Sequence, residues 1–194
     1  MRLDVESLLE AYANGAFPMA DEEGQIRWYT ANPRGVMPLD GSLHVPQTLR
    51  QVIRQGRFEV RINHDFEGAM RACMATRADD TWINEEIVAV YVALYRRGMA
   101  HSVEAWRDGR LAGGLYGVSM GAAFFGESMF HYQRDASKVA LVALVERLRE
   151  RGFVLLDTQT CSDHLRRFGG VEIEEADYLR RLGQAVAAGE RRFD

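Results

Sequence analysis

The chain has 194 residues, and its 28 acidic side chains outnumber its 24 basic ones, which gives a formal charge of −4 and a pI near 5.8. Hydrophobic residues make up 47% and charged residues 27%, as in globular proteins with a substantial core. The net acidity excludes a protein that coats nucleic acid through bulk charge. No apolar run approaches the ~18 residues of a membrane span, and two cysteines cannot make a disulfide framework. We therefore expect a cytoplasmic protein without a membrane attachment.

The first part of the chain is predicted to form short elements, because all four prolines lie within it and break regular structure. The expected elements are a helix over residues 5–14 that ends at Gly15, a strand over 26–29, a helix over 46–55 with Pro46 in its first turn, and a half-buried strand over 58–62 in which polar and apolar residues alternate.

The central part contains two capped helices followed by a run of strands. Asp65 precedes a helix through Cys73, and Asn84 precedes a helix over 85–97 whose charges complement its dipole. Residues 101–107 and 110–118 read as a hairpin around the turn Asp108–Gly109. A third strand is expected over 122–130.

The last part begins with a long helix that opens at Asp135, has a broad apolar face and ends at Gly152. Residues 153–159 begin with four consecutive apolar residues and show no alternation, which indicates a strand buried on both faces. Two short helices separated by a strand over 171–173 follow. Three strands, a crossover helix and another strand predict a mixed sheet with one parallel pair, in an α/β or α+β fold.

Two carboxylates lie inside these apolar strands, Glu127 in the third strand and Asp157 in the strand after the long helix. Burying a carboxylate costs about 5 kcal/mol unless it is paired or hydrogen-bonded. Each is therefore either functional or structural, and Glu127 can also face solvent. Both are expected near the carboxyl ends of their strands, where open α/β sheets bind ligands. Gln159 should share a strand face with Asp157 because strand side chains alternate.

Several weaker signals have two interpretations. Trp28, Tyr29 and Trp82 can stack a nucleobase or pack in the core. Four arginines at positions 50, 54, 57 and 61 can bind phosphate or form a solvated face. The only lysine, Lys138, can meet phosphate or pair with a carboxylate.

Other types of site have little support in the sequence. Cys161 and His164 are too close in sequence for a typical nucleophile and base. The five histidines lack the spacing of metal ligands, and no P-loop or dinucleotide fingerprint occurs. We therefore expect no metal.

Motifs along the whole chain resemble the bacterial leucyl/phenylalanyl-tRNA–protein transferase family. They are Ala11-Tyr12, Gly15-x-Phe17-Pro18, Trp28, Pro33-Arg34, Thr81-Trp82-Ile83, Ala100-His101-Ser102-Val103-Glu104, Gly113-Gly114-Leu115-Tyr116-Gly117-Val118, Phe125-Gly126-Glu127-Ser128-Met129-Phe130, Ala136-Ser137-Lys138, Leu156-Asp157-x-Gln159 and Asp163-His164. One departure is Met19, since many members have tryptophan there.

The resemblance implies a function and a fold. Leu or Phe, and less readily Met, would move from the 3′ aminoacyl-adenosine end of aminoacyl-tRNA to proteins with N-terminal Arg or Lys, marking them as N-degrons. No cofactor is needed, because the tRNA ester is already activated. The implied fold is α+β, with a reduced N-terminal subdomain over residues 1–34 and a GNAT-like acyltransferase domain over residues 35–194.

The resemblance also implies the site. Asp157 and Gln159 would be catalytic, with Gln159 orienting the amine and Asp157 polarising Gln159 or taking a proton. The substrate-binding set would be Trp28, Trp82, Leu115, Gly126, Glu127, Ser128, Met129, Leu141, Leu144, Leu148 and Leu156. The leucines are equally compatible with a plain core.

Three alternatives remain at the level of sequence. A GNAT enzyme that uses acyl-CoA needs a glycine-rich turn to cradle pyrophosphate, and residues 133–138 contain no glycine. A non-catalytic tRNA-binding module would leave Asp157 and Gln159 unexplained. A related tRNA–protein transferase with another amino-acid preference is the nearest competitor.

Overall fold

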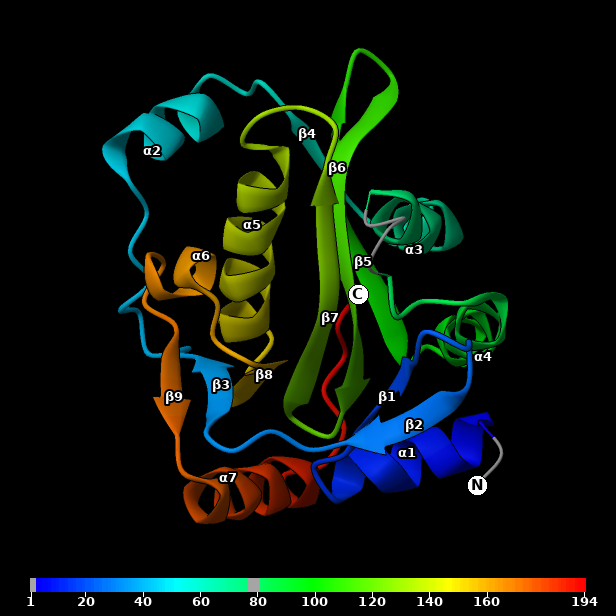
Figure 1. Ribbon diagram of the computed structural model, residues 1–194. Coiled ribbons are helices and arrows are strands. Elements are labelled where there is room, and N and C mark those ends of the chain that lie inside the picture. Colours follow the sequence, from blue (N-terminus) through cyan, green and yellow to red (C-terminus); the bar gives the residue numbers. More distant parts are fainter. Residues whose placement is uncertain (1–2, 77–80) are drawn as a thin grey trace.

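The structure is a computed structural model that describes residues 3–76 and 81–194 (Figure 1). Its elements are α1 (Val5–Ala13), β1 (Phe17–Ala20), β2 (Ile26–Tyr29), β3 (Arg34–Met37), α2 (Gln47–Arg54), β4 (Glu59–Ile62), α3 (Phe66–Ala75), α4 (Glu85–Arg96), β5 (Ala100–Arg107), β6 (Arg110–Met120), β7 (Ala123–His131), α5 (Ala136–Glu150), β8 (Leu155–Gln159), α6 (Asp163–Arg166), β9 (Val171–Ile173) and α7 (Glu175–Ala187). The predicted elements occur within about two residues of their expected bounds.

The strands form a hairpin, β1–β2, and a seven-stranded sheet in the order β4-β5-β6-β7-β8-β3-β9. Strands β4 to β7 pair antiparallel in sequence order. The chain then crosses through α5 and returns as β8, which is parallel to β7. The predicted α+β class and the parallel pair are therefore confirmed, and the order of elements is the one expected of a GNAT-like core.

Helices cover both faces of the sheet, so successive residues of a central strand enter different cores. In β6, Leu115 packs in the cluster that contains α5, whereas Tyr116 packs in the cluster that contains α3 and α4. Figure 1 shows α5 lying along the sheet, with α3 and α4 on its other side. In β8, Leu155 packs in the cluster that contains α3 and α4, and Leu156 packs in the cluster that contains α5. This two-sided burial explains the adjacent leucines of β8 and confirms the strand predicted there. Val154, which precedes β8, is 61% exposed.

The expected N-terminal subdomain, residues 1–34, contains α1 and the β1–β2 hairpin, and its first two residues lie outside the described residues. Asp4 caps α1 with a hydrogen bond from the backbone of Ser7. Leu8 and Tyr12 then pack into the same cluster as α3 and α4. The next strand, β3, begins at Arg34 and lies between β8 and β9 in the large sheet.

One predicted burial pattern is confirmed only in part. Residues 58–62 were expected to form a half-buried strand, and Phe58 and Ile62 do pack against the cluster that contains α5, but Val60 is 39% exposed. The physical reason is that β4 is an edge strand of the sheet, so its alternation does not place a full face against a helix layer. Among the described residues, no helix combines the length and apolar character needed to cross a membrane.

Candidate active site

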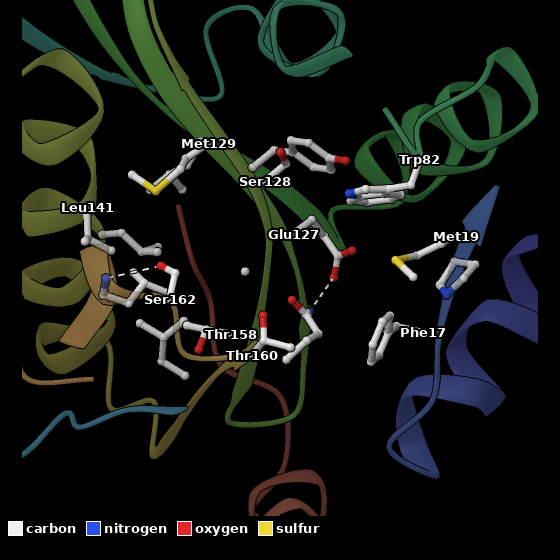
Figure 2. Close-up of a pocket in the computed structure, with 18 residues that line it drawn as sticks. Phe17, Met19, Trp82, Glu127, Ser128, Met129, Leu141, Thr158, Thr160 and Ser162 are labelled. Atoms are coloured by element: carbon white, nitrogen blue, oxygen red, sulfur yellow. Dashed lines mark hydrogen bonds between the residues drawn. The ribbon is translucent and has the colours of Figure 1, made fainter. Parts of the chain in front are cut away.

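A cavity of about 320 Å³ opens where β7 and β8 part. Their parallel pairing joins Ala123–Phe125 to Leu155–Asp157, and the residues just beyond that pairing line the cavity. The full lining is Phe17, Pro18, Met19, Trp82, Leu115, Tyr116, Gly126, Glu127, Ser128, Met129, Leu141, Leu144, Leu156, Thr158, Gln159, Thr160, Ser162 and Leu165 (Figure 2). A break between parallel strands thus creates a ligand-sized space at the centre of the sheet.

One wall of the cavity is apolar. Its side chains are Leu115 from β6, Met129 from β7, Leu141 and Leu144 from α5, Leu156 from β8 and Leu165 from α6. Leu141 and Leu144 lie one turn apart on α5 and therefore face the same side. Leu148, another predicted pocket residue, is fully buried in the core next to this wall and does not line the cavity.

The opposite edge of the cavity is polar. The Nε2 group of Gln159 donates a hydrogen bond of 3.3 Å to Oε1 of Glu127, drawn as a dashed line in Figure 2. Ser128 and Thr158 also line the cavity, and their buried hydroxyls have no hydrogen-bond partner among the described residues. Buried polar atoms usually have partners, so these two hydroxyls are available to a ligand.

Glu127 projects toward this edge because β7 carries a bulge. Gly126 pairs with Gly117, and Ser128 pairs with Tyr116, the neighbour of Gly117. Glu127 is therefore an extra residue of β7 that has no paired residue in β6. Bulges of this kind re-aim side chains next to functional sites. Glu127 therefore lies within β7 rather than at its carboxyl end, where the sequence had placed it.

The carboxyl group of Glu127 has an unusual environment. Tyr12 donates a hydrogen bond of 2.6 Å to Oε1, and Tyr91 donates one of 3.1 Å to Oε2. Desolvation raises the pKa of Glu127 from 4.5 to about 7, although the two tyrosine hydrogen bonds lower it. Glu127 can therefore change its protonation state near neutral pH, which suits proton transfer.

Asp157 lies beneath the cavity rather than in its lining. Its two oxygens accept hydrogen bonds from Nε and Nη2 of Arg34 at 2.9 and 2.6 Å, from the Tyr178 hydroxyl at 2.7 Å, and from the backbone N–H of Gln159 at 2.8 Å. Asp157 is fully buried and Arg34 is 1% exposed. These four hydrogen bonds hold the Asp157 carboxyl group in one orientation.

Gln159 is held in a conformation that few non-glycine residues adopt, with φ at +56°. The bond from its backbone N–H to Asp157 stabilises this turn at the end of β8. Alternation predicts that Asp157 and Gln159 leave the strand on the same face. Of the two, Gln159 lines the cavity and Asp157 does not.

The predicted aromatic residues occupy different places. Trp82 lines the cavity together with Phe17 and Met19 (Figure 2). Trp28 does not line it, but its strand pairs with the one that contains Pro18. The indole N–H of Trp28 is buried without a partner among the described residues.

The remaining sequence candidates lie outside the cavity lining. Lys138 pairs with Asp135 at 2.7 Å, so the carboxylate interpretation of Lys138 is confirmed. Of the four clustered arginines, Arg61 pairs with Glu59. Burial raises the pKa of the Cys161 thiol, which opposes a role as a nucleophilic thiolate.

Four residues that contact Glu127 or Asp157 were not predicted from the sequence as site residues: Tyr12, Arg34, Tyr91 and Tyr178. Eight residues of the cavity lining were also not predicted: Phe17, Pro18, Met19, Tyr116, Thr158, Thr160, Ser162 and Leu165. Tyr12 and Arg34 lie in short motifs of the resemblance, which was the available signal. Tyr91 and Tyr178 occupy apolar helix faces where a tyrosine is indistinguishable from a core aromatic. Only the fold brings their hydroxyls to Glu127 and Asp157.

Comparisons with known proteins identify the family of the chain. A family model described as leucyl/phenylalanyl-tRNA protein transferase matches residues 36–183, and the model of that family's N-terminal domain matches residues 1–32. The chain is 58% identical to the leucyl/phenylalanyl-tRNA–protein transferase of Rubrobacter xylanophilus, over 96% of each chain. It is 52% identical to that of Paramagnetospirillum magneticum, over 95% of this chain and 90% of the relative.

Two solved structures share low sequence identity with the chain. One is a ribosomal-protein-alanine N-acetyltransferase from Brucella melitensis biovar Abortus 2308, with 17% identity, a TM-score of 0.42, and coverage of 57% of this chain and 86% of that one. The other is the C-terminal domain of a putative lysylphosphatidylglycerol synthetase from Agrobacterium fabrum, with 12% identity, a TM-score of 0.48, and coverage of 94% and 75%. The family matches and the relatives span nearly the whole sequence, and the chain therefore belongs to the leucyl/phenylalanyl-tRNA protein transferase family.

Proposed function

We propose that this aminoacyltransferase moves Leu or Phe, and less readily Met, from aminoacyl-tRNA to the α-amine of proteins that begin with Arg or Lys. The observation that carries the proposal is the cavity, which joins an apolar leucine wall to the polar pair Glu127 and Gln159. The product would be an N-degron, so the enzyme would mark proteins for degradation in the cytoplasm.

The apolar wall supports the choice of donor. Leu, Phe and Met have unbranched Cβ atoms and can extend between the α5 leucines and Met129, whereas Ile and Val carry an extra group at Cβ. A hydrophobic pocket distinguishes single methylene groups by only ~1–3 kcal/mol. Shape at Cβ is therefore a better basis for selection than the total apolar area. The 3′-terminal adenosine binds at the aromatic edge, where Trp82 offers a stacking surface.

The reaction depends more on orienting the amine and the ester than on activating them, because the tRNA ester is already reactive. The acceptor amine attacks the ester carbonyl, an amide bond forms, and the 3′ oxygen of the tRNA ribose leaves with a proton. Orienting the two substrates can supply a large part of the rate. Gln159 orients the attacking amine through its side-chain amide, and Glu127 binds an amine and accepts a proton from it.

In this proposal Asp157 acts through its neighbours rather than on the substrate. Its hydrogen bond to the backbone of Gln159 fixes the turn that aims the Gln159 amide. Its ion pair with Arg34 ties β8 to β3, and the same guanidinium donates a 2.7 Å bond to the carbonyl of Gly15. Asp157 is therefore a positioning residue that keeps the site aligned with the N-terminal part of the chain.

The turn before α5 argues against the acyl-CoA alternative. Asp135 lies at the N-terminus of this helix, and its carboxylate pairs with Lys138 at 2.7 Å and with Arg134 at 3.7 Å. A pyrophosphate would need that helix end, but residues 133–138 contain no glycine that would let the backbone cradle it.

The experiment mixes the protein with Leu-tRNA or Phe-tRNA and a peptide that begins with Arg or Lys, without ATP or CoA. Mass spectrometry should find the peptide longer by one Leu or Phe. The same peptide with an acetylated N-terminus is the matched control and should remain unchanged, because its α-amine is blocked. If no peptide is extended, or if extension requires an acyl-CoA, the proposal is wrong.

A further inference from the structure

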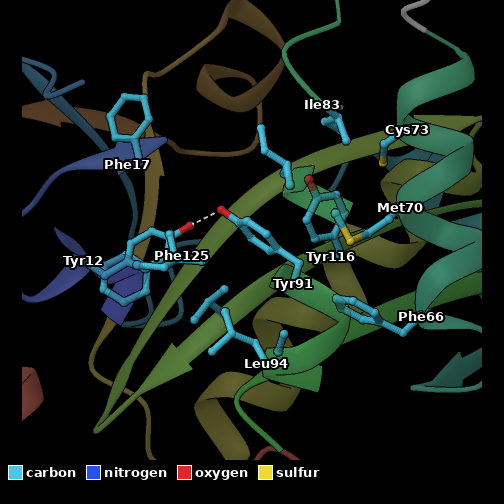
Figure 3. Close-up of a cluster of buried hydrophobic side chains, with 14 of the residues drawn as sticks. Tyr12, Phe17, Phe66, Met70, Cys73, Ile83, Tyr91, Leu94, Tyr116 and Phe125 are labelled. Atoms are coloured by element: carbon cyan, nitrogen blue, oxygen red, sulfur yellow. Dashed lines mark hydrogen bonds between the residues drawn. The ribbon is translucent and has the colours of Figure 1, made fainter. Parts of the chain in front are cut away.

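A triangle of short contacts surrounds the Glu127 carboxyl group. The hydroxyl oxygens of Tyr12 and Tyr91 lie 2.5 Å apart, and Figure 3 draws this contact as a dashed line. Tyr12 also lies 2.6 Å from Oε1 and Tyr91 3.1 Å from Oε2 of Glu127. The two tyrosines come from α1 and α4, and the carboxyl group comes from the bulge of β7.

Counting protons shows what this triangle contains. Three oxygen–oxygen contacts at hydrogen-bonding distance need three hydrogens, and the two tyrosine hydroxyls supply two of them. A neutral Glu127 supplies the third, and each group can then donate one bond and accept one. If Glu127 is ionised, both hydroxyls donate to its oxygens and stabilise the carboxylate, and the contact between Tyr12 and Tyr91 has no hydrogen.

We propose that Tyr12, Tyr91 and Glu127 form one hydrogen-bonded unit that holds a single transferable proton, and that the two tyrosines are positioning residues for the carboxyl group. This inference rests on the proposed function and adds a means of controlling the proton. A cationic amine that enters the cavity donates N–H bonds to the Glu127 carboxyl group and stabilises its ionised form, and the proton released by Glu127 passes to solvent. The ionised Glu127 can then accept a proton from the amine.

The other polar groups near Glu127 do not replace the tyrosines. Asp157 raises the pKa of Glu127 and Arg34 lowers it, and these two already neutralise each other in their ion pair. Tyr178 donates to Asp157, and Gln159 donates a longer 3.3 Å bond to Oε1. The ring of Tyr116 packs edge-on against Tyr91 at 5.8 Å. The tyrosine hydroxyls therefore provide the shortest contacts of the Glu127 carboxyl group.

The first test measures the proton directly. Infrared spectra recorded across pH 5 to 9 follow the carbonyl band of the protonated Glu127, identified by its loss in Glu127→Gln. Because both tyrosine bonds lower the pKa of Glu127, Tyr12→Phe and Tyr91→Phe should each move the titration to higher pH, on the order of one pH unit for a bond to a charged group. The shift should be larger for Tyr12, whose bond is shorter.

Tyr95→Phe is the matched control. It removes a hydroxyl from the same helix as Tyr91, but that hydroxyl donates to the carbonyl of Asn63, so the titration should not move. Urea unfolding verifies that each variant is folded, and the tyrosines on two different helices give two independent variants.

The second test measures transfer to an Arg-initiated peptide against pH. In Tyr12→Phe and Tyr91→Phe the acidic limb of the kcat/KM profile should shift to higher pH. A shift of one pH unit lowers kcat/KM by about tenfold at a fixed pH below 7. If wild type transfers Leu but neither the infrared titration nor the acidic limb moves in these variants, the inference is wrong. If the titration moves and no protein transfers Leu, the proposed function is wrong instead.

Discussion

At the scale of single residues, the site depends on two carboxylates with opposite environments. Asp157 is fully buried and accepts four hydrogen bonds, two of them from Arg34. Glu127 lines the cavity, and desolvation raises its pKa to about 7. Hydrogen bonds therefore fix the Asp157 carboxyl group in place, whereas the Glu127 carboxyl group can exchange a proton. Two carboxylates that look alike in sequence acquire different roles from their neighbours.

Asp157→Ala should lower the free energy of unfolding by about 3–5 kcal/mol, because it leaves the guanidinium of Arg34 buried without its partner. Urea unfolding followed by fluorescence measures this loss. Glu22→Ala removes an exposed carboxylate and should change stability by less than about 0.5 kcal/mol. A stable Asp157→Ala protein that loses only the chemical step would instead indicate direct participation of this carboxylate.

Gln159 permits a cleaner test of orientation. Gly and Asn both tolerate a positive φ, so Gln159→Gly and Gln159→Asn should fold normally. Both lose the reach of the amide toward Glu127, and we expect kcat/KM for peptide extension to fall by about 10²-fold. Unchanged kinetics in both variants would remove Gln159 from the mechanism.

At the scale of elements, the cavity depends on how closely α5 approaches the sheet. A Cβ atom at Gly113 of β6 would lie 2.7 Å from the Cβ of Ala136 and 3.0 Å from the backbone nitrogen of Ser137. The absence of a side chain there lets the start of α5 contact β6. The same helix then presents Leu141 and Leu144 to the cavity and Leu148 to the core.

Two glycine substitutions test this packing. Gly113→Ala should lower stability by about 1–3 kcal/mol through overpacking. Gly183→Ala is the control, since this α7 glycine has open space around its Cβ position, and alanine in a helix should add about 0.5–1 kcal/mol. The Tm should therefore fall in Gly113→Ala and rise in Gly183→Ala. A similar Tm for both variants would show that α5 can adjust freely.

Two leucines of α5 separate donor binding from core packing. Leu144→Ala and Leu148→Ala should both lose about 2–5 kcal/mol of stability. Leu144 lines the cavity and Leu148 does not. The ratio of kcat/KM for Phe-tRNA to that for Leu-tRNA should therefore rise in Leu144→Ala, because the enlarged cavity favours the larger side chain. It should stay constant in Leu148→Ala, and a change there would contradict the assigned cavity wall.

At the scale of the whole molecule, a desolvated carboxylate links folding to pH. The folded protein binds more protons than the unfolded chain between 4.5 and about 7, the two pKa values of Glu127. Its contribution to stability is therefore complete at low pH and is lost as pH rises through about 7. His101 acts in the opposite direction, because burial lowers its pKa from 6.5 to about 4.

Glu127→Gln isolates the first effect. The free energy of unfolding of the variant, minus that of wild type, should increase from pH 4.5 to pH 7 and then level off, since only wild type must ionise a buried carboxyl group. His101 is present in both proteins, so its contribution cancels. Urea titrations at intervals across this range give the difference. A flat difference would mean that the folded protein does not perturb Glu127.

Local periodicity, turn residues and short spacings in the sequence predict most of the elements, the parallel pair and the family motifs. They did not predict β1 or β3. Pro33 and Pro38 flank β3, and its close approach to β8, where a Cβ at Gly35 would come within 2.4 Å of the backbone of Thr160, is a tertiary contact. The sequence also could not reveal the bulge at Glu127, the triangle with Tyr12 and Tyr91, or the clamp of Arg34 on Asp157. The triangle and the clamp join residues that are 36 to 123 positions apart. Only packing of the tertiary structure decides whether such a buried polar side chain meets a ligand or another residue.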